Sequence, residues 1–327
     1  MRILVTGGGG FLGRKLIAAL LTDVSDLGLI SQAISLDRVA PPIEDARLSV
    51  KIGDISDQAL LAVLFAEKID IVWHLAAAVS GECEADLDLG LTINLQGTLN
   101  LLQAARAAGN APRFVFASSV AVFGGDLPDK VDDDTVITPD SSYGSQKVVG
   151  EILVKDFARR GSIDGRSLRL PTVVVRPGRP NKAASSFASG ILREPLSDQD
   201  SICPVSPDSK VAVISPRRAV AGLIAGAVLP PPAFGPGRVM NLPGITVTVA
   251  EQVEALKRFA GASAADRISW EPDPVVQSLV LSWPGGVTSQ RALAAGLTPD
   301  ESIDAIVEAY IEDDLPGGPV ETRRRPM

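Results

Sequence analysis

Histidine is nearly absent from this 327-residue chain, which contains only His74. A Ser-His-Asp hydrolytic arrangement or a multi-histidine metal site would have to use this one residue, and nothing near it supports either role. His74 lies within the apolar segment 69–75, which predicts a buried strand. We therefore interpret His74 as a satisfied core residue, and we expect no metal site.

Cysteine, long apolar runs and an excess of positive charge are also lacking. The chain has two thiols, Cys83 and Cys203, and no export signal, so we expect free cysteines and a cytoplasmic protein. No apolar run is long enough to cross a bilayer, and we expect no membrane partner. The net charge of -8 predicts no nucleic-acid partner, although a locally basic pocket can still admit a small anionic substrate.

Residues 2–16 carry the pattern around which the rest of the chain is organised. The apolar run 3–5 predicts a strand buried on both faces, and a glycine-rich turn follows it and leads into a helix. Gly7 suits a tight turn, Gly10 lets the backbone approach a pyrophosphate, and Gly13 lets the helix pack against the strand. An ordinary glycine-rich loop is the alternative. Strand, turn and helix in this order predict a dinucleotide-binding unit.

Asp37 ends the second predicted strand, about 20 residues beyond the glycine turn. A carboxylate at this spacing accepts hydrogen bonds from the adenosine ribose and repels a 2′-phosphate, which favours NAD over NADP. Arg38 follows directly and could pair with such a phosphate, so the preference depends on Asp37 alone. A plain turn residue is the alternative interpretation of Asp37.

Two further strand ends carry residues suited to a cofactor. Asp54 follows the third predicted strand and suits an adenine amino contact, although it could equally cap the helix that begins near Asp57. Ala76 and Ala77 end the fourth predicted strand, where small residues let a cofactor lie across the sheet. These positions predict a ligand at the carboxyl edge of a parallel sheet.

Tyr143 and Lys147 lie four residues apart in the helix predicted to begin at Ser142. At that spacing both side chains project from the same helix face, one turn from each other. A phenol with a pKa near ~10 is a poor base at neutral pH, and a neighbouring ammonium favours its ionised form. The pair therefore suits a tyrosine acid/base, and a surface tyrosine beside a solvated lysine is the alternative.

The motifs occur in a defined order: the glycine pattern from Thr6 to Gly13, Asp54, Ala76-Ala77, Asn94, Ser119 and Tyr143-x-x-x-Lys147. This order resembles the extended short-chain dehydrogenase/reductase family, most strongly over the first half of the chain. The resemblance implies that Tyr143 is the general acid/base, that Lys147 lowers its pKa and binds the nicotinamide ribose, and that Ser119 orients the substrate oxygen. It also implies that Asn94 helps to hold a proton-relay water.

The resemblance further implies ligand contacts and a homodimer formed through the helices that contain Leu91 and Tyr143. The expected NAD contacts are Gly7, Gly10, Phe11, Leu12, Asp37, Asp54, Ile55, Leu75, Ala76, Ala77, Asn94, Tyr143, Lys147, Pro171 and Thr172. The expected substrate contacts are Ser80, Ser119, Tyr143, Thr172, Asn181, Lys182 and Arg217.

The predicted fold class is α/β, with a Rossmann-type doubly wound parallel sheet and a smaller, interleaved α/β substrate-binding lobe. The expected boundaries are 1–176 plus about 209–241 for the Rossmann domain, about 177–208 and 242–318 for the lobe, and 319–327 for a tail. Segment 211–214 is predicted to return as a strand to the first domain. The acidic loop 126–140 is expected to be exposed.

Arg217 follows Ser215 and Pro216, which predict the N-cap and first position of a helix that continues through Val228. A cation in the first turn of a helix opposes the helix dipole unless an anion accompanies it. Arg217 is therefore a candidate carboxylate-binding residue. A solvated arginine or an internal salt bridge is the alternative.

Within the family, the segments RPGRPNKAASSF and SPRRAV resemble the branch that uses NAD to oxidise the C2 hydroxyl of a four-carbon sugar acid, D-erythronate. A small aldonate needs a carboxylate clamp, which Arg217, Asn181 and Lys182 are expected to supply. A nucleoside-diphosphate-sugar epimerase or dehydratase is the first alternative. A non-catalytic NAD(P)-binding redox sensor is the second, and the presence of Ser119, Tyr143 and Lys147 disfavours it.

Overall fold

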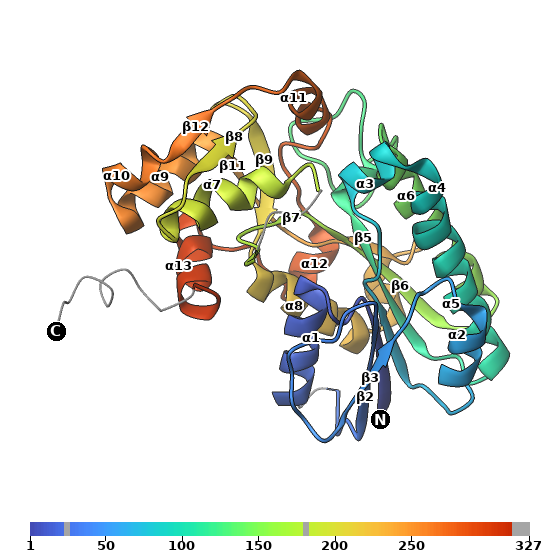
Figure 1. Ribbon diagram of the computed structural model, residues 1–327. Coiled ribbons are helices and arrows are strands. Elements are labelled where there is room, and N and C mark those ends of the chain that lie inside the picture. The colour runs from blue at the N-terminus through green and yellow to red at the C-terminus, as the bar shows by residue number, and fades with distance from the viewer. Residues whose placement is uncertain (23–26, 179–182, 316–327) are drawn as a thin grey trace.

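A seven-stranded parallel sheet organises the computed structural model, which describes residues 1–22, 27–178 and 183–315 (Figure 1). The strand order is β10-β6-β5-β4-β1-β2-β3, which is the doubly wound order with one strand added beside β6. These strands are β1 (Arg2–Thr6), β2 (Gln32–Asp37), β3 (Leu48–Ile52), β4 (Ile71–His74), β5 (Arg113–Ser119), β6 (Asp164–Leu170) and β10 (Val239–Asn241). The predicted Rossmann-type sheet is confirmed.

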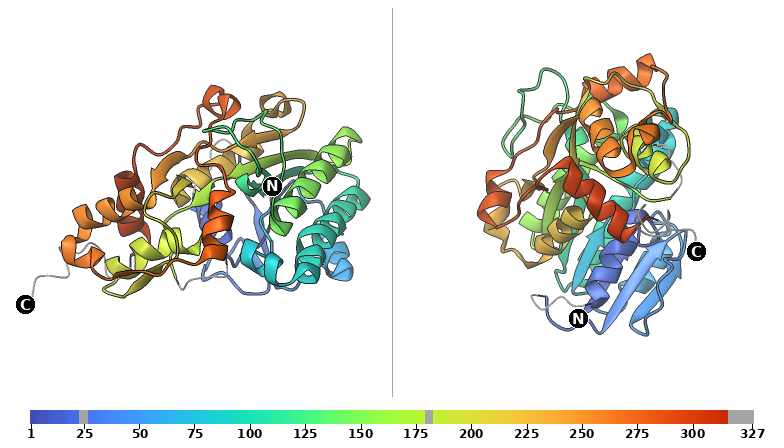
Figure 2. Two further views of the ribbon diagram at one scale, coloured as in Figure 1. Left: turned by 90° about the horizontal axis from the view of Figure 1, so that it is seen from above. Right: turned by 90° about the vertical axis from the view of Figure 1, so that its left-hand side faces the viewer.

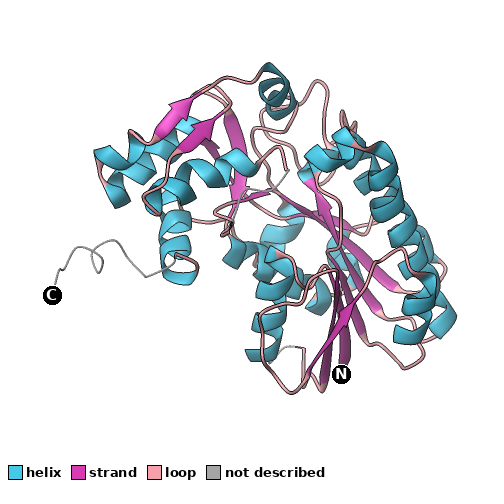
Figure 3. Ribbon diagram, viewed as in Figure 1, coloured by secondary structure: helices cyan, strands magenta, loops and turns pink. Residues whose placement is uncertain are grey.

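Helices cover both faces of this sheet because its strands are apolar on both sides (Figure 3). Ile3 and Val5 of β1 pack in one core cluster, and Leu4 packs in the cluster on the opposite face. The first cluster includes α1 (Phe11–Thr22) and α8 (Pro216–Val228), and the second includes α2 (Gln58–Leu64), α5 (Thr98–Ala108) and α6 (Ser142–Arg159). The N-cap predicted at Ser215 is confirmed, since its Oγ accepts a hydrogen bond from the Arg218 N–H at 3.1 Å.

A second, smaller lobe with its own core lies beside the large sheet (Figure 2). Its strands form two small sheets, in the order β11-β9-β7 and as the pair β12-β8. They are β7 (Thr172–Val173), β8 (Ser201–Cys203), β9 (Lys210–Ile214), β11 (Ile245–Thr248) and β12 (Ile268–Trp270), accompanied by α7 (Ser186–Leu196), α9 (Val249–Ala260), α10 (Ala262–Ala265), α11 (Pro274–Leu281) and α13 (Ile303–Asp313). Leu192, Leu256 and Tyr310 are among the buried residues of this core.

Short elements connect these layers, mainly near the carboxyl ends of the large sheet. They are α3 (Ser80–Ala85), α4 (Leu87–Gly90), the π-helix η1 (Leu91–Gly97), the 3₁₀ turns η2 (Val120–Val122) and η3 (Pro231–Phe234), and α12 (Gln290–Ala294). The predicted helix 91–108 therefore begins as a π-helix and continues as α5.

The chain returns to the large sheet through α8 and β10, whereas the strand predicted at 211–214 joins the three-stranded sheet. Ile214 at its end packs in the core cluster of α1 and α8, and the predicted domain boundaries stay a prediction. Segment 211–214 belongs to β9, which pairs in parallel with β7 and antiparallel with β11. Pro171 explains the change of sheet: proline has no N–H to donate to a sheet ladder, and the large sheet ends at Leu170 directly before it. The short strand after Pro171 then takes β9 as its partner.

The acidic loop 126–140, expected to be exposed, is partly packed against other segments. Val131 is fully buried and forms a bridge with the C-terminal part of the chain. The Asp133 carboxylate accepts hydrogen bonds from Ser289 Oγ at 2.8 Å and from the Asn241 N–H at 2.9 Å. These donors fix the loop beside β10, which composition alone does not reveal.

The core interpretation of His74 is confirmed. Its ring nitrogens lie 2.7 Å from Thr6 Oγ1 and 2.8 Å from Thr98 Oγ1, and burial lowers the pKa of His74 to about 3. Cys83 and Cys203 are both buried and free, as predicted. Within residues 1–22, 27–178 and 183–315, no helix has the length and apolar character needed to span a membrane.

Candidate active site

Two adjoining cavities lie at the carboxyl ends of the large sheet. Gly7, Gly10, Leu75 and Ala77 line both of them, so the two form one elongated site. Their volumes are about 280 Å³ and 250 Å³. Ligands of doubly wound sheets bind at this edge, and two linked compartments fit the two halves of a dinucleotide.

The glycine loop has the geometry that a dinucleotide requires. Gly7 has a φ of +73°, in the left-handed region, and a Cβ there would lie 2.7 Å from the nitrogen of Ala76. A Cβ on Gly13 would clash with the carbonyl of Gly7, because α1 packs directly against the turn. A Cβ on Gly10 would approach only the Gly7 oxygen, at 3.2 Å, so this position opens onto the cavity. The loop can therefore receive a pyrophosphate against its backbone.

Asp37 and Asp54 line the second cavity, which we name the adenosine compartment. Asp37 Oδ2 accepts hydrogen bonds from the backbone N–H groups of Gly9, at 3.0 Å, and Gly10, at 3.2 Å. This carboxylate thus lies against the glycine loop at the end of β2. Asp57 rather than Asp54 caps α2, which leaves Asp54 beside the cavity. The other predicted cofactor residues here are Ile55, Leu75, Ala76 and Ala77.

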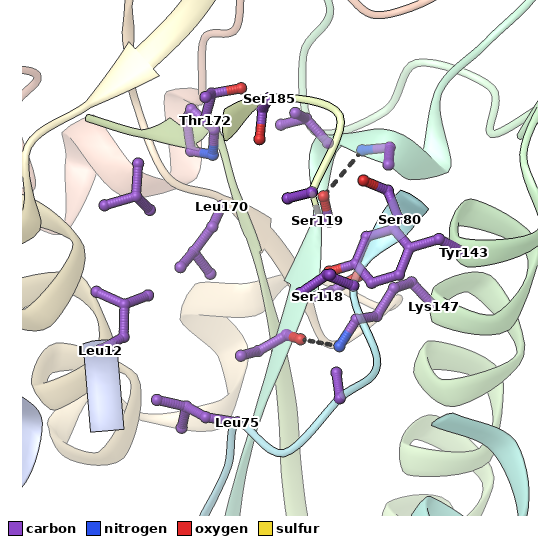
Figure 4. A pocket seen from close by; sticks show the side chains of 18 of the residues that line it. Leu12, Leu75, Ser80, Ser118, Ser119, Tyr143, Lys147, Leu170, Thr172 and Ser185 are labelled. Carbon is purple, nitrogen blue, oxygen red and sulfur yellow. Dashed lines mark hydrogen bonds between the residues drawn. The ribbon is translucent and has the colours of Figure 1, made fainter. Parts of the chain in front are cut away.

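Ser119, Tyr143 and Lys147 line the first cavity, which we name the catalytic compartment (Figure 4). Ser119 ends β5, and its Oγ accepts a hydrogen bond from the Ala121 N–H at 3.1 Å. Tyr143 and Lys147 lie one turn apart on α6, as their spacing predicts. Lys147 Nζ donates to the carbonyl of Ala117 at 2.8 Å and lies 5.5 Å from the centre of the Tyr143 ring. Two elements distant in sequence thus bring the three side chains together.

The charges in this compartment depend mainly on burial. Burial raises the pKa of the Tyr143 phenol to about 12, while a hydrogen bond with Ser119 and the Arg176 guanidinium act in the opposite direction. Burial lowers the pKa of Lys147 to about 8, and the Glu151 carboxylate opposes that change. The role of Lys147 in lowering the pKa of Tyr143 stays a prediction for the enzyme with its cofactor bound.

Asn94 lies behind the end of β4 and lines neither compartment. It belongs to η1, and its side chain is buried. Its Oδ1 accepts a hydrogen bond from the Ala78 N–H at 2.8 Å, and its Nδ2 donates to Gln146 Oε1 at 2.7 Å. Asn94 therefore connects the segment after β4 to α6, and its role with a relay water stays a prediction.

The structure does not bring Arg217 to either compartment. Its guanidinium forms ion pairs with Asp313 at 2.6 Å and Glu312 at 2.8 Å, at the end of α13, and the side chain is 49% exposed. Hydrogen bonds from these carboxylates raise the pKa of Arg217. The protein itself thus supplies the anion expected at the start of α8. This agrees with the internal salt bridge given as the alternative, and Arg217 does not act as a substrate clamp in this arrangement.

The remaining predicted contacts divide into two groups. Phe11, Leu12, Ser80, Pro171 and Thr172 line the catalytic compartment, whereas Asn181 and Lys182 lie outside the described residues.

Two long side chains that are not among the predicted site residues also line this compartment, Arg176 and Trp283. Arg176 had a readable signal, because a cation closely follows a buried strand and precedes the turn residues Pro177 and Gly178. Trp283 had none, since its segment reaches the site only through the tertiary fold.

Comparisons with known proteins agree with this geometry. The model of the NAD dependent epimerase/dehydratase family matches residues 3–208. The chain is 50% identical over 320 residues to a D-erythronate dehydrogenase of Cupriavidus necator, covering 96% of this chain and 98% of that protein. It is 39% identical over 317 residues to a D-erythronate dehydrogenase of Haemophilus influenzae, covering 96% and 100%. A crystal structure described as a nucleoside-diphosphate-sugar epimerase, from Agrobacterium tumefaciens, has a TM-score of 0.91 and 40% identity, covering 97% and 95%.

Proposed function

Because this chain belongs to the NAD-dependent epimerase/dehydratase family, whose members use NAD(P), we propose that it oxidises the C2 hydroxyl of a small sugar acid of the D-erythronate type. The reaction removes a hydride from C2 and a proton from the hydroxyl group. The products are the 2-keto acid, NADH and a proton released to water. The two D-erythronate dehydrogenases that match nearly the whole chain support this choice.

One observation carries the proposal: Ser119, Tyr143 and Lys147 line a single compartment beside the glycine loop. A phenol, an ammonium one helical turn away and a hydroxyl are groups that take a proton from an alcohol and stabilise the carbonyl that forms. A protein that only senses a dinucleotide has no need of this set. The arrangement therefore favours an enzyme over a redox sensor.

The side chains act in the following way. Tyr143, as the phenolate, accepts the proton of the C2 hydroxyl, and Ser119 donates a hydrogen bond to the same oxygen as it becomes a carbonyl. Lys147, positioned by the carbonyl of Ala117, holds a positive charge near the phenolate. When bound, NAD supplies the hydride acceptor and the positive nicotinamide ring. That added charge opposes the effect of burial on the phenol pKa.

NAD rather than NADP is the proposed cofactor, and Asp37 is the reason. Its carboxylate lies at the end of β2 against the N–H groups of Gly9 and Gly10. A ribose bound at this position would place its hydroxyl groups beside an acceptor, whereas a 2′-phosphate would meet a negative charge.

The direct test is NADH formation, followed by absorbance, with NAD and a panel of four-carbon aldonates that includes D-erythronate and L-threonate. UDP-sugars are assayed in parallel by separating epimeric products, since epimerisation yields no net NADH. We expect turnover of an aldonate. Inert aldonates together with an epimerised UDP-sugar would reject the proposal in favour of the epimerase alternative, which the 40% identical structure keeps open.

A homodimer is the proposed assembly. Leu87, Leu91, Val149 and Ile152 are exposed apolar side chains on α4, η1 and α6, and these elements contact one another. Such a surface suits burial against a second copy of the chain. Sedimentation equilibrium should give a dimer for the native protein and a monomer for Ile152→Asp, and a monomeric native protein would contradict the assembly.

A further inference from the structure

Arg176 is a cation in the catalytic compartment that the proposed chemistry has not yet used. It lies three residues beyond the end of β7 and lines the compartment together with Tyr143 and Ser119. The Arg176 guanidinium opposes the rise that burial causes in the pKa of the Tyr143 phenol, as expected of a cation that lines the same compartment. A positive side chain thus lies where the substrate must bind.

The structure holds Arg176 in place through groups that carry no negative charge. Its Nη2 donates to Ser185 Oγ at 2.8 Å, and its backbone N–H donates to Ser189 Oγ at 3.1 Å. Ser185 also lines the compartment, and Figure 4 labels it. The carbonyl of Arg176 accepts a hydrogen bond from Arg193 Nη1 at 2.6 Å. These contacts orient the arginine without neutralising its charge.

Arg176 is partly buried, and the arginines with buried side chains are paired differently. Three of them face a carboxylate, in the pairs Arg166–Asp164, Arg169–Glu151 and Arg193–Glu194. Over the part of the chain that the structure describes, no carboxylate forms an ion pair with Arg176. The arginine beside the reacting groups therefore differs from the structural ones in lacking an internal anion.

The missing counter-charge makes Arg176 a favourable site for an anion. Burial and the neighbouring Arg193 lower the pKa of Arg176 to about 10, so the guanidinium stays charged at neutral pH. A desolvated cation without a counter-charge is unfavourable, and an incoming carboxylate relieves that cost. A guanidinium also offers two parallel N–H donors, which match the two oxygens of a carboxylate.

We infer that Arg176 binds the carboxylate of the substrate and thereby selects 2-hydroxy acids over neutral polyols. This inference rests on the proposed function and adds to it the residue that recognises the acid. In a 2-hydroxy acid, the carboxylate is bonded to the carbon that bears the reacting hydroxyl. A residue that holds the carboxylate must therefore line the same compartment as the acid/base, as Arg176 does.

The test compares Arg176→Ala and Arg176→Lys with the native enzyme on D-erythronate and on erythritol, a polyol without a carboxylate. Arg176→Ala should lose about 100-fold in kcat/KM for D-erythronate, because a charged hydrogen-bonded pair is removed. The rate with erythritol should fall far less, because there the variant loses only the effect of Arg176 on the Tyr143 phenol. The affinity for NADH should change little, because the glycine loop is untouched. The kcat/KM of Arg176→Lys for D-erythronate should lie between those of Arg176→Ala and the native enzyme, since lysine keeps the charge and loses the bidentate hydrogen-bonding geometry. Arg258→Ala, which removes an exposed arginine paired with Asp304, is the matched control.

The inference is overturned if folded Arg176→Ala has the same kcat/KM for D-erythronate as the native enzyme. If the alanine variant fails to fold, the same result in Arg176→Lys overturns it. A second measurement separates this failure from that of the proposed function. Oxalate, a planar carboxylate, is titrated into the enzyme–NADH complex and followed by NADH fluorescence. If the native enzyme oxidises no aldonate, the proposed function fails. If oxalate binds Arg176→Ala and the native enzyme equally, the inference fails.

Discussion

The two ends of the elongated site are formed by different kinds of residue. The adenosine end is formed by residues that directly follow or end strands, such as Asp37, Gly53 and Ala76, while the substrate end depends on the long side chains of Arg176 and Trp283. A phosphate is recognised by backbone N–H groups, which a short glycine motif is enough to present. A small acid is recognised by a few side chains whose reach depends on tertiary contacts. One end of the site is therefore encoded by local sequence and the other by the tertiary fold.

The largest expected effect comes from the acid/base in the catalytic compartment. Tyr143→Phe removes the proton acceptor without changing the shape of the pocket, so kcat should fall by roughly 1000-fold. Binding of NADH, followed by its fluorescence, should change little because the glycine loop is untouched. If the variant keeps substantial turnover, the assignment of Tyr143 as acid/base is wrong.

Glu151→Gln should affect both stability and the pH profile. Glu151 pairs with the buried Arg169 at 2.7 Å and accepts a hydrogen bond from Ser118 Oγ at 2.6 Å. Loss of its charge leaves the buried Arg169 without a counter-charge. The free energy of unfolding, measured by urea denaturation, should therefore fall by about 3 kcal/mol.

The pH effect of the same variant has a definite sign. The Glu151 carboxylate raises the pKa of Lys147, which burial lowers to about 8. Without that carboxylate the pKa of Lys147 falls further, fewer molecules keep the ammonium at pH 8, and the alkaline limb of the kcat profile moves to lower pH. Asp156→Asn, which removes an exposed carboxylate on the same helix, should leave the profile in place. An unmoved limb in Glu151→Gln would show that Lys147 does not sense this charge.

Asp37→Ser tests the adenosine end. Removal of the carboxylate takes away an acceptor for the ribose hydroxyls and should raise KM for NAD about tenfold. The ratio of NADP to NAD activity should rise, since the repelling charge is gone. Steady-state kinetics with both cofactors measures the change. An unaltered ratio would mean that Arg38 or another group determines the preference.

Arg217→Ala should have the smallest effect and sharpens the contrast with Arg176. Arg217 is bound by Asp313 and Glu312 outside both compartments, so kcat/KM for D-erythronate should change by less than about threefold. Thermal unfolding should shift only slightly, because the ion pairs are half exposed. A large loss of activity would restore Arg217 as a substrate ligand.

What could be predicted from the sequence follows the same division. The pair Tyr143 and Lys147 needs only helical spacing, and the glycine loop needs only the order of strand, turn and helix. The sequence also predicts the helix that contains Arg217. Asp313, which forms an ion pair with Arg217, lies 96 residues further along the chain. No local sequence pattern predicts which carboxylate will form an ion pair at the start of that helix. For the same reason, the sheet to which segment 211–214 belongs depended on Pro171 and on a partner strand elsewhere.

The π-helix η1 has a consequence for how this chain tolerates changes in length. An α-helix rotates by about 100° per residue, and a π turn accommodates one additional residue. The wide turn lets Asn94 face Ala78 while Leu101 and Leu102, on the α-helix that continues from it, face the sheet. Removal of a single residue from 91–97 would turn one of these faces about a quarter of a revolution away from its target. The length of this stretch therefore sets the rotation of one surface relative to the other.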